Sequence, residues 1–122
     1  MPRPVLADEH IHPAVRELVA SLHTDVVRQV QAAIGQHPVV VVGMAGNPFV
    51  RKARRALDAA GVAHHDLDYG SYFSAWRRRN ALKMWTGWPT FPMVFVKGVL
   101  VGGAVDLKAL IDRGELARML RA

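Results

Sequence analysis

The stretch from Trp88 to Gly103, WPTFPMVFVKGVLVGG, constrains the fold more than any other part of the chain. Two short apolar runs, Met93–Val96 and Val99–Val101, flank the pair Lys97-Gly98, which places a glycine where a positive φ is needed. Apolar β-branched and aromatic runs around a two-residue connection predict a β-hairpin. Pro92 stands directly before the first run, and a proline, which has no N–H, belongs at the start of a strand. This stretch therefore predicts a hairpin with a proline at its entry.

The segments before the hairpin alternate between helix and strand patterns. Four consecutive valines, Val39–Val42, predict a strand buried on both faces, so the sheet must be covered by helices on both sides. Asn47-Pro48 predicts the start of a helix, with asparagine as the N-cap and proline at the first helical position, and Gly61 predicts its end. Val62–Leu67 predicts a second strand, and residues 74–85 predict a further helix.

Helical patterns also open and close the chain. Apolar spacing predicts helix from Pro13 to Leu22 and again over residues 26–34, as two helices or one bent helix. Asp106 is expected to cap a last helix, which Arg113-Gly114 interrupts. The central strand–helix–strand unit requires a right-handed crossover and parallel strands, whereas the hairpin is antiparallel. The pattern therefore predicts an α/β domain around a mixed, four-stranded sheet.

The segment Trp88-Pro89-Thr90-Phe91-Pro92, together with Gly102-Gly103, resembles the glutaredoxin family, and more closely its monothiol branch, over roughly residues 24–120. The resemblance implies the thioredoxin fold with a cis bond before Pro92. It also implies a division of the chain into residues 1–23, an N-terminal extension with a helix, and residues 24–122, a glutaredoxin-like domain.

The family works through a cysteine, and this chain contains none. In the family, the nucleophile lies at the start of the helix after the first strand, where the helix dipole stabilises a thiolate. Aligned with a Cys-Pro-Tyr-Cys motif, Asn47 takes the nucleophile's place and Val50 the resolving position. Alternatively, Asn47-Pro48 matches a Thr-Pro of the monothiol pattern, and the cysteine-bearing loop is largely deleted.

Neither alignment supplies a thiol. Thiol–disulfide exchange requires an attacking thiolate, so the usual reaction of the family is excluded, and no catalytic residue is expected. Iron–sulfur ligation by the chain's own thiolates is excluded for the same reason. Asn47 is interpreted as a helix cap. The chain is therefore expected to be redox-inactive, although its family consists of oxidoreductases.

The resemblance implies that the family's glutathione-binding surface persists in part. A cis bond at Pro92 is expected to turn the N–H and C=O of Phe91 outward, where an extended peptide can pair with them. Basic side chains before the hairpin are expected near a ligand carboxylate, although Met44 and Ala45 occupy the places where relatives carry a further lysine. The predicted ligand-binding residues are Arg79, Lys83, Thr90, Phe91, Pro92, Gly103 and Asp106. The competing interpretations are a helix cap for Asp106 and a solvated helix face for Arg77–Arg79.

The expected function is a binding module for a glutathione-like ligand, a peptide or a protein partner, and glutathione is the one cofactor suggested. The alternative is a protein associated with nucleic acid, because 16 basic and 10 acidic residues give a net charge of +6. It would use the basic clusters Arg51–Arg55 and Arg77–Arg79, which must then form one continuous stripe to follow a phosphate backbone.

The sequence indicates neither a metal site, nor a membrane span, nor a signal peptide. His10, His12, His64 and His65 are interpreted as surface residues rather than metal ligands, because no carboxylate support is evident beside them. No apolar run approaches the ~18 residues of a membrane span. The first residues contain no apolar signal-peptide region. A cytoplasmic protein is therefore expected.

Overall fold

The computed structural model describes residues 3–21, 23–71 and 74–122. After a short 3-10 turn at Asp8–His10, the elements are α1 (Pro13–Ser21), α2 (Thr24–Gln36), β1 (Val39–Gly43), α3 (Pro48–Ala59), β2 (His65–Asp68), α4 (Trp76–Thr86), β3 (Met93–Val96), β4 (Val99–Gly102), α5 (Ala104–Asp112) and α6 (Glu115–Arg121). Among these described residues, no helix is both long enough and apolar enough to cross a membrane.

The four strands form one mixed sheet, as predicted, and their order is β2-β1-β3-β4. β1 runs parallel to β2, with Val40 opposite His65, and antiparallel to β3, with Val42 opposite Met93. The hairpin connection carries a positive φ at both Lys97 (49°) and Gly98 (80°). Two positive φ values match the right-handed twist of the paired strands, which explains the tight turn.

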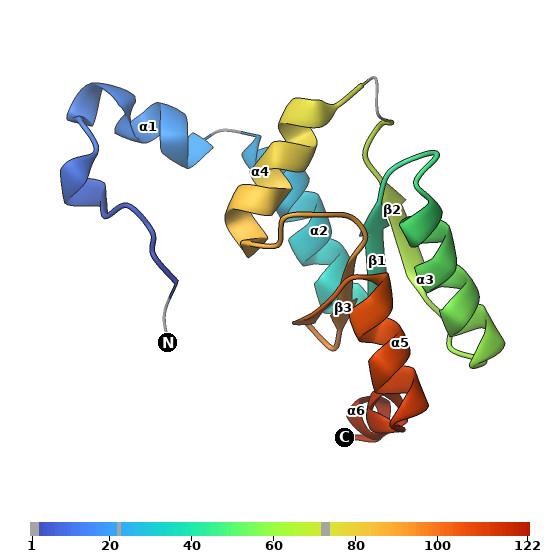
Figure 1. Ribbon diagram of the computed structural model, residues 1–122. Coiled ribbons are helices and arrows are strands. Elements are labelled where there is room, and N and C mark those ends of the chain that lie inside the picture. Colours follow the sequence, from blue (N-terminus) through green and yellow to red (C-terminus); the bar gives the residue numbers. More distant parts are fainter. Residues whose placement is uncertain (1–2, 22, 72–73) are drawn as a thin grey trace.

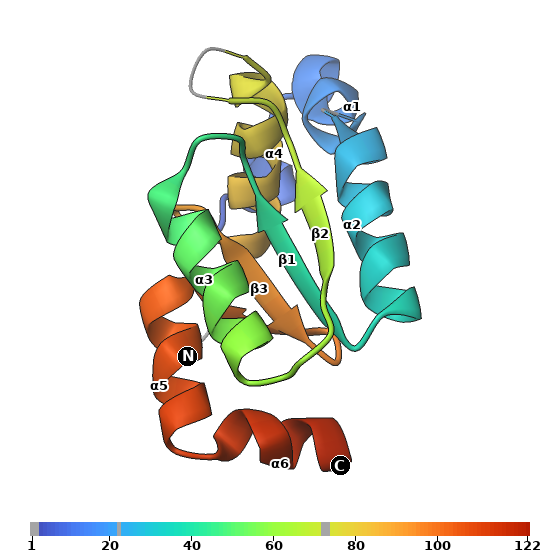
Figure 2. The ribbon, with the colours of Figure 1, turned by 90° about the vertical axis from the view of Figure 1, so that its right-hand side faces the viewer.

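Helices cover both faces of the sheet (Figure 2). Because side chains alternate along a strand, Val40 and Val42 point into a core with α2 and α4, where Val30 and Leu82 are fully buried. The alternate valines of β1 point into a second core with α3, α5 and α6. The buried members of that second core include Val39, Val41, Ala53, Leu57, Leu107 and Leu116.

The N-terminal helical region forms two separate helices. α1 ends at Ser21 and α2 begins at Thr24. α2 is anchored by Val26 and Val30, whereas α1 buries none of its residues and projects from the side of the molecule occupied by α2 and α4 (Figure 1). Leu22, which belongs to the predicted apolar stripe, lies outside the described residues.

Two predicted boundaries are corrected. β2 begins at His65 rather than Val62, because the Val62 N–H donates to the Leu57 carbonyl (2.9 Å) and so closes the turn after α3. α5 begins at Ala104 with Gly103 as its N-cap, so Asp106 is the third residue of the helix rather than the cap. The cause is a hydrogen bond in which the Asp106 carboxylate accepts the Gly103 N–H (2.9 Å). This bond stabilises a helix that starts at Ala104, two residues before Asp106.

Candidate ligand-binding edge around Phe91

Three segments meet at one end of the sheet. Val42 pairs with Met93 in antiparallel register, so the chain leaving β1 lies beside the chain entering β3. Val94 pairs with Gly102, which brings the start of α5 to the same end. The start of α3, the segment before β3 and the start of α5 are therefore neighbours (Figure 2). Within this region, we call Lys83, Thr90, Phe91, Pro92 and Gly103 the Phe91 edge.

The Phe91 edge presents backbone groups that have no hydrogen-bond partner among the residues that the structure describes. The Phe91–Pro92 bond is cis, as the resemblance implied. Across the described ranges, neither the N–H nor the C=O of Phe91 takes part in a hydrogen bond. A buried backbone donor or acceptor without a partner is costly, so nearly all such groups are paired with protein or water. Phe91 can therefore accept an extended backbone beside it.

Gly103 leaves room beside Pro92. A Cβ atom at Gly103 would lie 3.6 Å from the Pro92 carbonyl oxygen and 3.8 Å from Nε1 of Trp88, both ordinary contact distances. The Trp88 indole N–H is buried and has no hydrogen-bond partner within the described part of the chain. One oxygen of the predicted ligand residue Asp106 accepts the Gly103 N–H, which favours the helix-capping interpretation of that carboxylate.

The two basic ligand candidates differ in position. Lys83, on α4, places its Nζ 5.8 Å from the centroid of the Phe91 ring, so a positive charge stands beside the edge. Arg79 is buried, and its Nη1 donates to the carbonyl oxygens of Tyr69 (3.0 Å) and Ser74. Arg79 thus helps to fix the connection between β2 and α4. Thr90 is exposed on the loop before Phe91.

Asn47 caps α3, as predicted. Its side-chain oxygen accepts the backbone N–H groups of Phe49 (2.8 Å) and Val50 (3.2 Å), and Pro48 occupies the first turn. The side chain satisfies two of the free donors at the helix start. An amide in this role offers no nucleophile.

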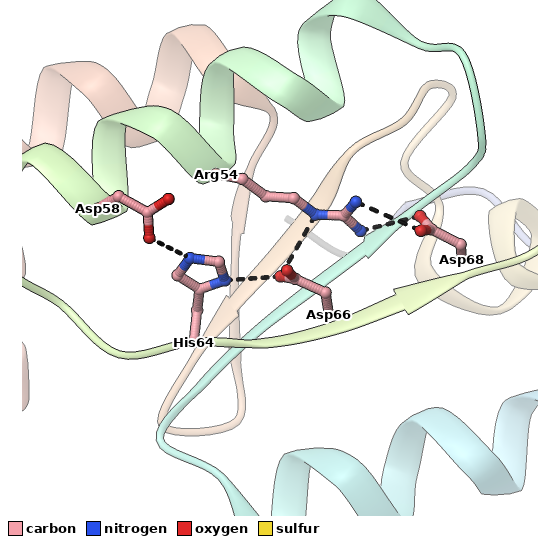
Figure 3. A network of polar contacts seen from close by, with 5 residues as sticks. All are labelled: Arg54, Asp58, His64, Asp66 and Asp68. Atoms are coloured by element: carbon pink, nitrogen blue, oxygen red, sulfur yellow. Dashed lines mark hydrogen bonds and ion pairs between the residues drawn. The ribbon is translucent and has the colours of Figure 1, made fainter.

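A polar network on the α3 face was not anticipated. Arg54 of α3 forms a two-pronged pair with Asp68 (2.8 and 3.3 Å) and lies 3.3 Å from Asp66. His64 lies between Asp58 and Asp66, at 2.8 Å through Nε2 and 2.6 Å through Nδ1 (Figure 3). The expectation that no carboxylate supports this histidine is wrong, because the α3–β2 connection brings Asp58 of the preceding helix next to the strand.

The network shifts the titration of His64. Burial by itself would lower the pKa of His64, but the hydrogen bonds to Asp58 and Asp66 and their negative charges outweigh burial and raise it. His65 instead stacks on His37, with ring centroids 4.1 Å apart. No group of three histidine or acidic side chains within the described part of the chain could hold a metal ion.

The arginine clusters of the nucleic-acid alternative do not form one stripe. Arg51–Arg55 belongs to α3, which covers one face of the sheet, and Arg77–Arg79 belongs to α4, which covers the other (Figure 2). Within the clusters, Arg54 is paired with carboxylates and Arg79 is buried against carbonyl oxygens. A continuous track for phosphates is therefore not present.

The sheet order, the helices on both faces and the cis proline at the sheet end define a thioredoxin-like fold. The crystal structure of a buckwheat glutaredoxin–glutathione complex matches it with a TM-score of 0.73 at 22% sequence identity, covering 83% of this chain and 92% of that chain. A crystal structure of oxidized glutaredoxin 2 from Chlamydomonas reinhardtii gives a TM-score of 0.70 at 24% identity, covering 81% and 94%. The extra N-terminal helix α1 precedes this fold.

Sequence comparison identifies the family. The glutaredoxin family model matches residues 39–101. A glutaredoxin-like protein of Dictyostelium discoideum is 43% identical over 107 residues, which cover 88% of this chain and 87% of that protein. The chain belongs to the glutaredoxin family, and it does so without a cysteine.

Proposed function

We propose that this protein is a redox-inactive glutaredoxin-like binding module, which holds a glutathione-like ligand, a peptide or a segment of a protein partner along the Phe91 edge. The observation that carries the proposal is the pair of backbone groups of Phe91 that have no hydrogen-bond partner within the described residues. An extended peptide can pair with them as an added strand pairs with a sheet edge. The solved buckwheat relative, whose structure is a glutathione complex, supports this choice of ligand.

Each residue of the edge has a distinct task in the proposal. Phe91 supplies one donor and one acceptor for the ligand backbone. Gly103, which has no side chain, leaves space for the ligand beside Pro92. Lys83 supplies a positive charge for a ligand carboxylate, so the proposal predicts a preference for anionic ligands. Arg79 holds the β2–α4 connection through Nη1, so its contribution to the ligand is indirect in this proposal.

Isothermal titration calorimetry with reduced glutathione tests the ligand. The wild-type protein is expected to bind, and Lys83→Ala is expected to weaken binding by roughly tenfold, the value of one charge-assisted hydrogen bond. Arg118→Ala is the matched control, because it removes an exposed cation from α6, away from the edge. Equal losses in both variants would show that net charge, not the Phe91 edge, attracts the ligand. Absence of heat at millimolar glutathione would remove glutathione and leave peptides and protein partners.

A thiol–disulfide reductase assay with glutathione and a mixed disulfide tests the second half of the proposal. No turnover above buffer is expected, because the chain has no attacking thiolate. Robust turnover by the purified chain would overturn the assignment as a redox-inactive module.

A further inference from the structure

An apolar groove lies between α3 and α5, on the face of the sheet opposite α2 and α4 (Figure 2). It has a volume of about 650 Å³, within the range of ~300–1,000 Å³ that is usual for small-molecule sites. Four alanines leave this space unfilled, because each projects only a methyl group between the helices. They are Ala56 and Ala59 on α3, Ala60 at its C-cap, and Ala104 on α5.

The α3 side of the groove is arranged in two rows. Phe49, Ala56 and Ala60 recur at intervals of seven and four residues, so at ~100° per residue they lie in one row along the helix. This apolar row borders the buried face of α3. Lys52 and Arg55 lie on the other side of the row, toward solvent, and both are exposed. On α3, the groove is therefore apolar at depth and basic at its rim.

The α5 side repeats this arrangement with a different charge balance. Ala104 and Ile111, seven residues apart, form an apolar row beside the buried Leu107. Lys108 lies on the solvent side of this row and is exposed. Its ammonium group is paired with the carboxylate of Asp112 (2.7 Å). The α5 rim therefore carries a cation whose charge is already offset.

The unbalanced positive charge lies on the α3 rim. None of the described residues that line the groove is acidic. Lys52 and Arg55 form no ion pair with any residue that the structure describes. The Lys52 ammonium lies 5.4 Å from the centroid of the Phe49 ring, so it stands directly at the apolar row. An apolar space with unpaired cations on one side matches a molecule that has an apolar body and one anionic head.

We propose that the groove between α3 and α5 binds an amphiphilic carboxylate, a small molecule with an apolar chain or ring and a single carboxylate group. The apolar part lies along the alanines and Ile111, where it is removed from water. The carboxylate pairs with Arg55, whose guanidinium can donate two parallel N–H groups to it, and with Lys52 as a point charge. The groove and the Phe91 edge use different residues, so either can bind without the other.

Titration of the ¹⁵N-labelled full chain with sodium decanoate, kept below its micelle concentration, tests the proposal. Saturable shifts are expected for the backbone amides of Ala56, Lys108 and Ile111, with Phe91 unchanged. Decyltrimethylammonium has the same chain with a cationic head, and butyrate has the carboxylate with a short chain. Both are expected to bind roughly tenfold more weakly or worse, which corresponds to the loss of one charged contact or of a few buried methylene groups. Equal affinity of either probe would overturn the proposal.

Variants of the groove test the two parts of the site. Arg55→Gln is expected to lower the affinity for decanoate about tenfold, the value of one charge-assisted hydrogen bond. Arg28→Gln is the matched control, because it makes the same change at an exposed position of α2, on the opposite face of the sheet, and it should bind like the wild type. Equal losses in both variants would show attraction by net charge alone and overturn the proposal.

Ala56→Leu is expected to abolish saturable binding, because the larger side chain fills the groove. Ala56 is only partly buried and leucine favours a helix, so the fold should be retained, as checked by circular dichroism. Undiminished binding of decanoate by this variant would place the ligand elsewhere and overturn the proposal.

A membrane surface is the competing occupant, and flotation with phosphatidylglycerol vesicles examines it. If decanoate gives no saturable shift while the vesicles bind in a way that depends on Arg55, the groove belongs to a membrane surface and the proposal is wrong. Shifts that do not saturate and that spread over both faces of the sheet would show detergent-like binding only, and they would overturn it as well.

Discussion

The side-chain oxygen of Asn47 lies 2.8 Å from the backbone nitrogen of Phe49 and so caps the helix that follows β1. In one of the two alignments with the glutaredoxin family this helix start corresponds to the position of the nucleophile, and here an amide occupies it. At the neighbouring Phe91 edge, the backbone groups of Phe91 have no hydrogen-bond partner among the described residues. The absence of a thiol and the proposed binding at this edge can thus be examined separately.

Asn47→Ala is expected to lower the free energy of unfolding by about 1 kcal/mol, the usual cost of losing a helix N-cap. Asn47→Asp keeps an oxygen acceptor at the same place and is expected to remain within a few tenths of the wild type. Urea denaturation followed by circular dichroism measures both variants. If alanine and aspartate behaved alike, the cap would contribute nothing to stability.

Asn47→Cys is expected to place a reactive thiol at the start of α3. The helix dipole favours the thiolate, so its pKa should fall below the ordinary value of about 8.5. The measurement is the pH dependence of alkylation by iodoacetamide, and Ala45→Cys in the exposed part of the same loop serves as the control. Equal pKa values in the two variants would contradict the view that Asn47 stands at the family's nucleophile position.

His64 predicts a pH dependence of stability. Its pKa is raised in the folded protein above the ordinary 6.5, because the protonated ring binds the carboxylates of Asp58 and Asp66. The stabilisation is therefore complete below the unfolded pKa and is lost as pH rises through the folded pKa. The stability of the wild type, measured by thermal unfolding, should therefore fall as the pH rises above 6.5, and the stability of His64→Gln should depend less on pH. His10→Gln, at an exposed position, is the control, and its stability should vary with pH as that of the wild type does.

The two adjacent glycines at the end of β4, Gly102 and Gly103, are predicted to respond differently to a methyl group. Gly102 has φ +108°, and an added Cβ would lie 2.6 Å from the Asp106 carboxylate, so Gly102→Ala should destabilise the protein by roughly 2 kcal/mol. Gly103 has room for a Cβ, so Gly103→Ala should fold normally and lose ligand affinity instead. Thermal unfolding together with calorimetry separates the two effects. Equal destabilisation would contradict the packing described for Gly103.

The fold was largely predictable because its signals are local. The valine run of β1, the Asn47-Pro48 helix start and the two-residue hairpin each depend on neighbours in sequence. The boundary errors at Val62 and Asp106 have a different origin. Val62 donates a hydrogen bond to Leu57 of α3, and Asp106 accepts one from Gly103, and neither hydrogen bond is visible in the pattern of apolar residues.

The candidate site was predictable only in part. The cis Phe91–Pro92 bond and the Asn47 cap followed from sequence motifs, and the structure confirms both. The burial of Arg79 and the carboxylates around His64 depend on how α4 and α3 pack against the connections of β2, so no local pattern could have indicated them. The ligand roles of Lys83, Thr90 and Gly103 stay predictions.

The most direct test of the binding edge is the backbone amide signal of Phe91 in ¹⁵N-labelled protein titrated with reduced glutathione. A saturable shift is predicted for Phe91 and Gly103, with no change at Ala56 on α3. If the Phe91 amide does not move at millimolar glutathione while other amides show saturable binding, the ligand lies elsewhere and the binding edge described here is contradicted.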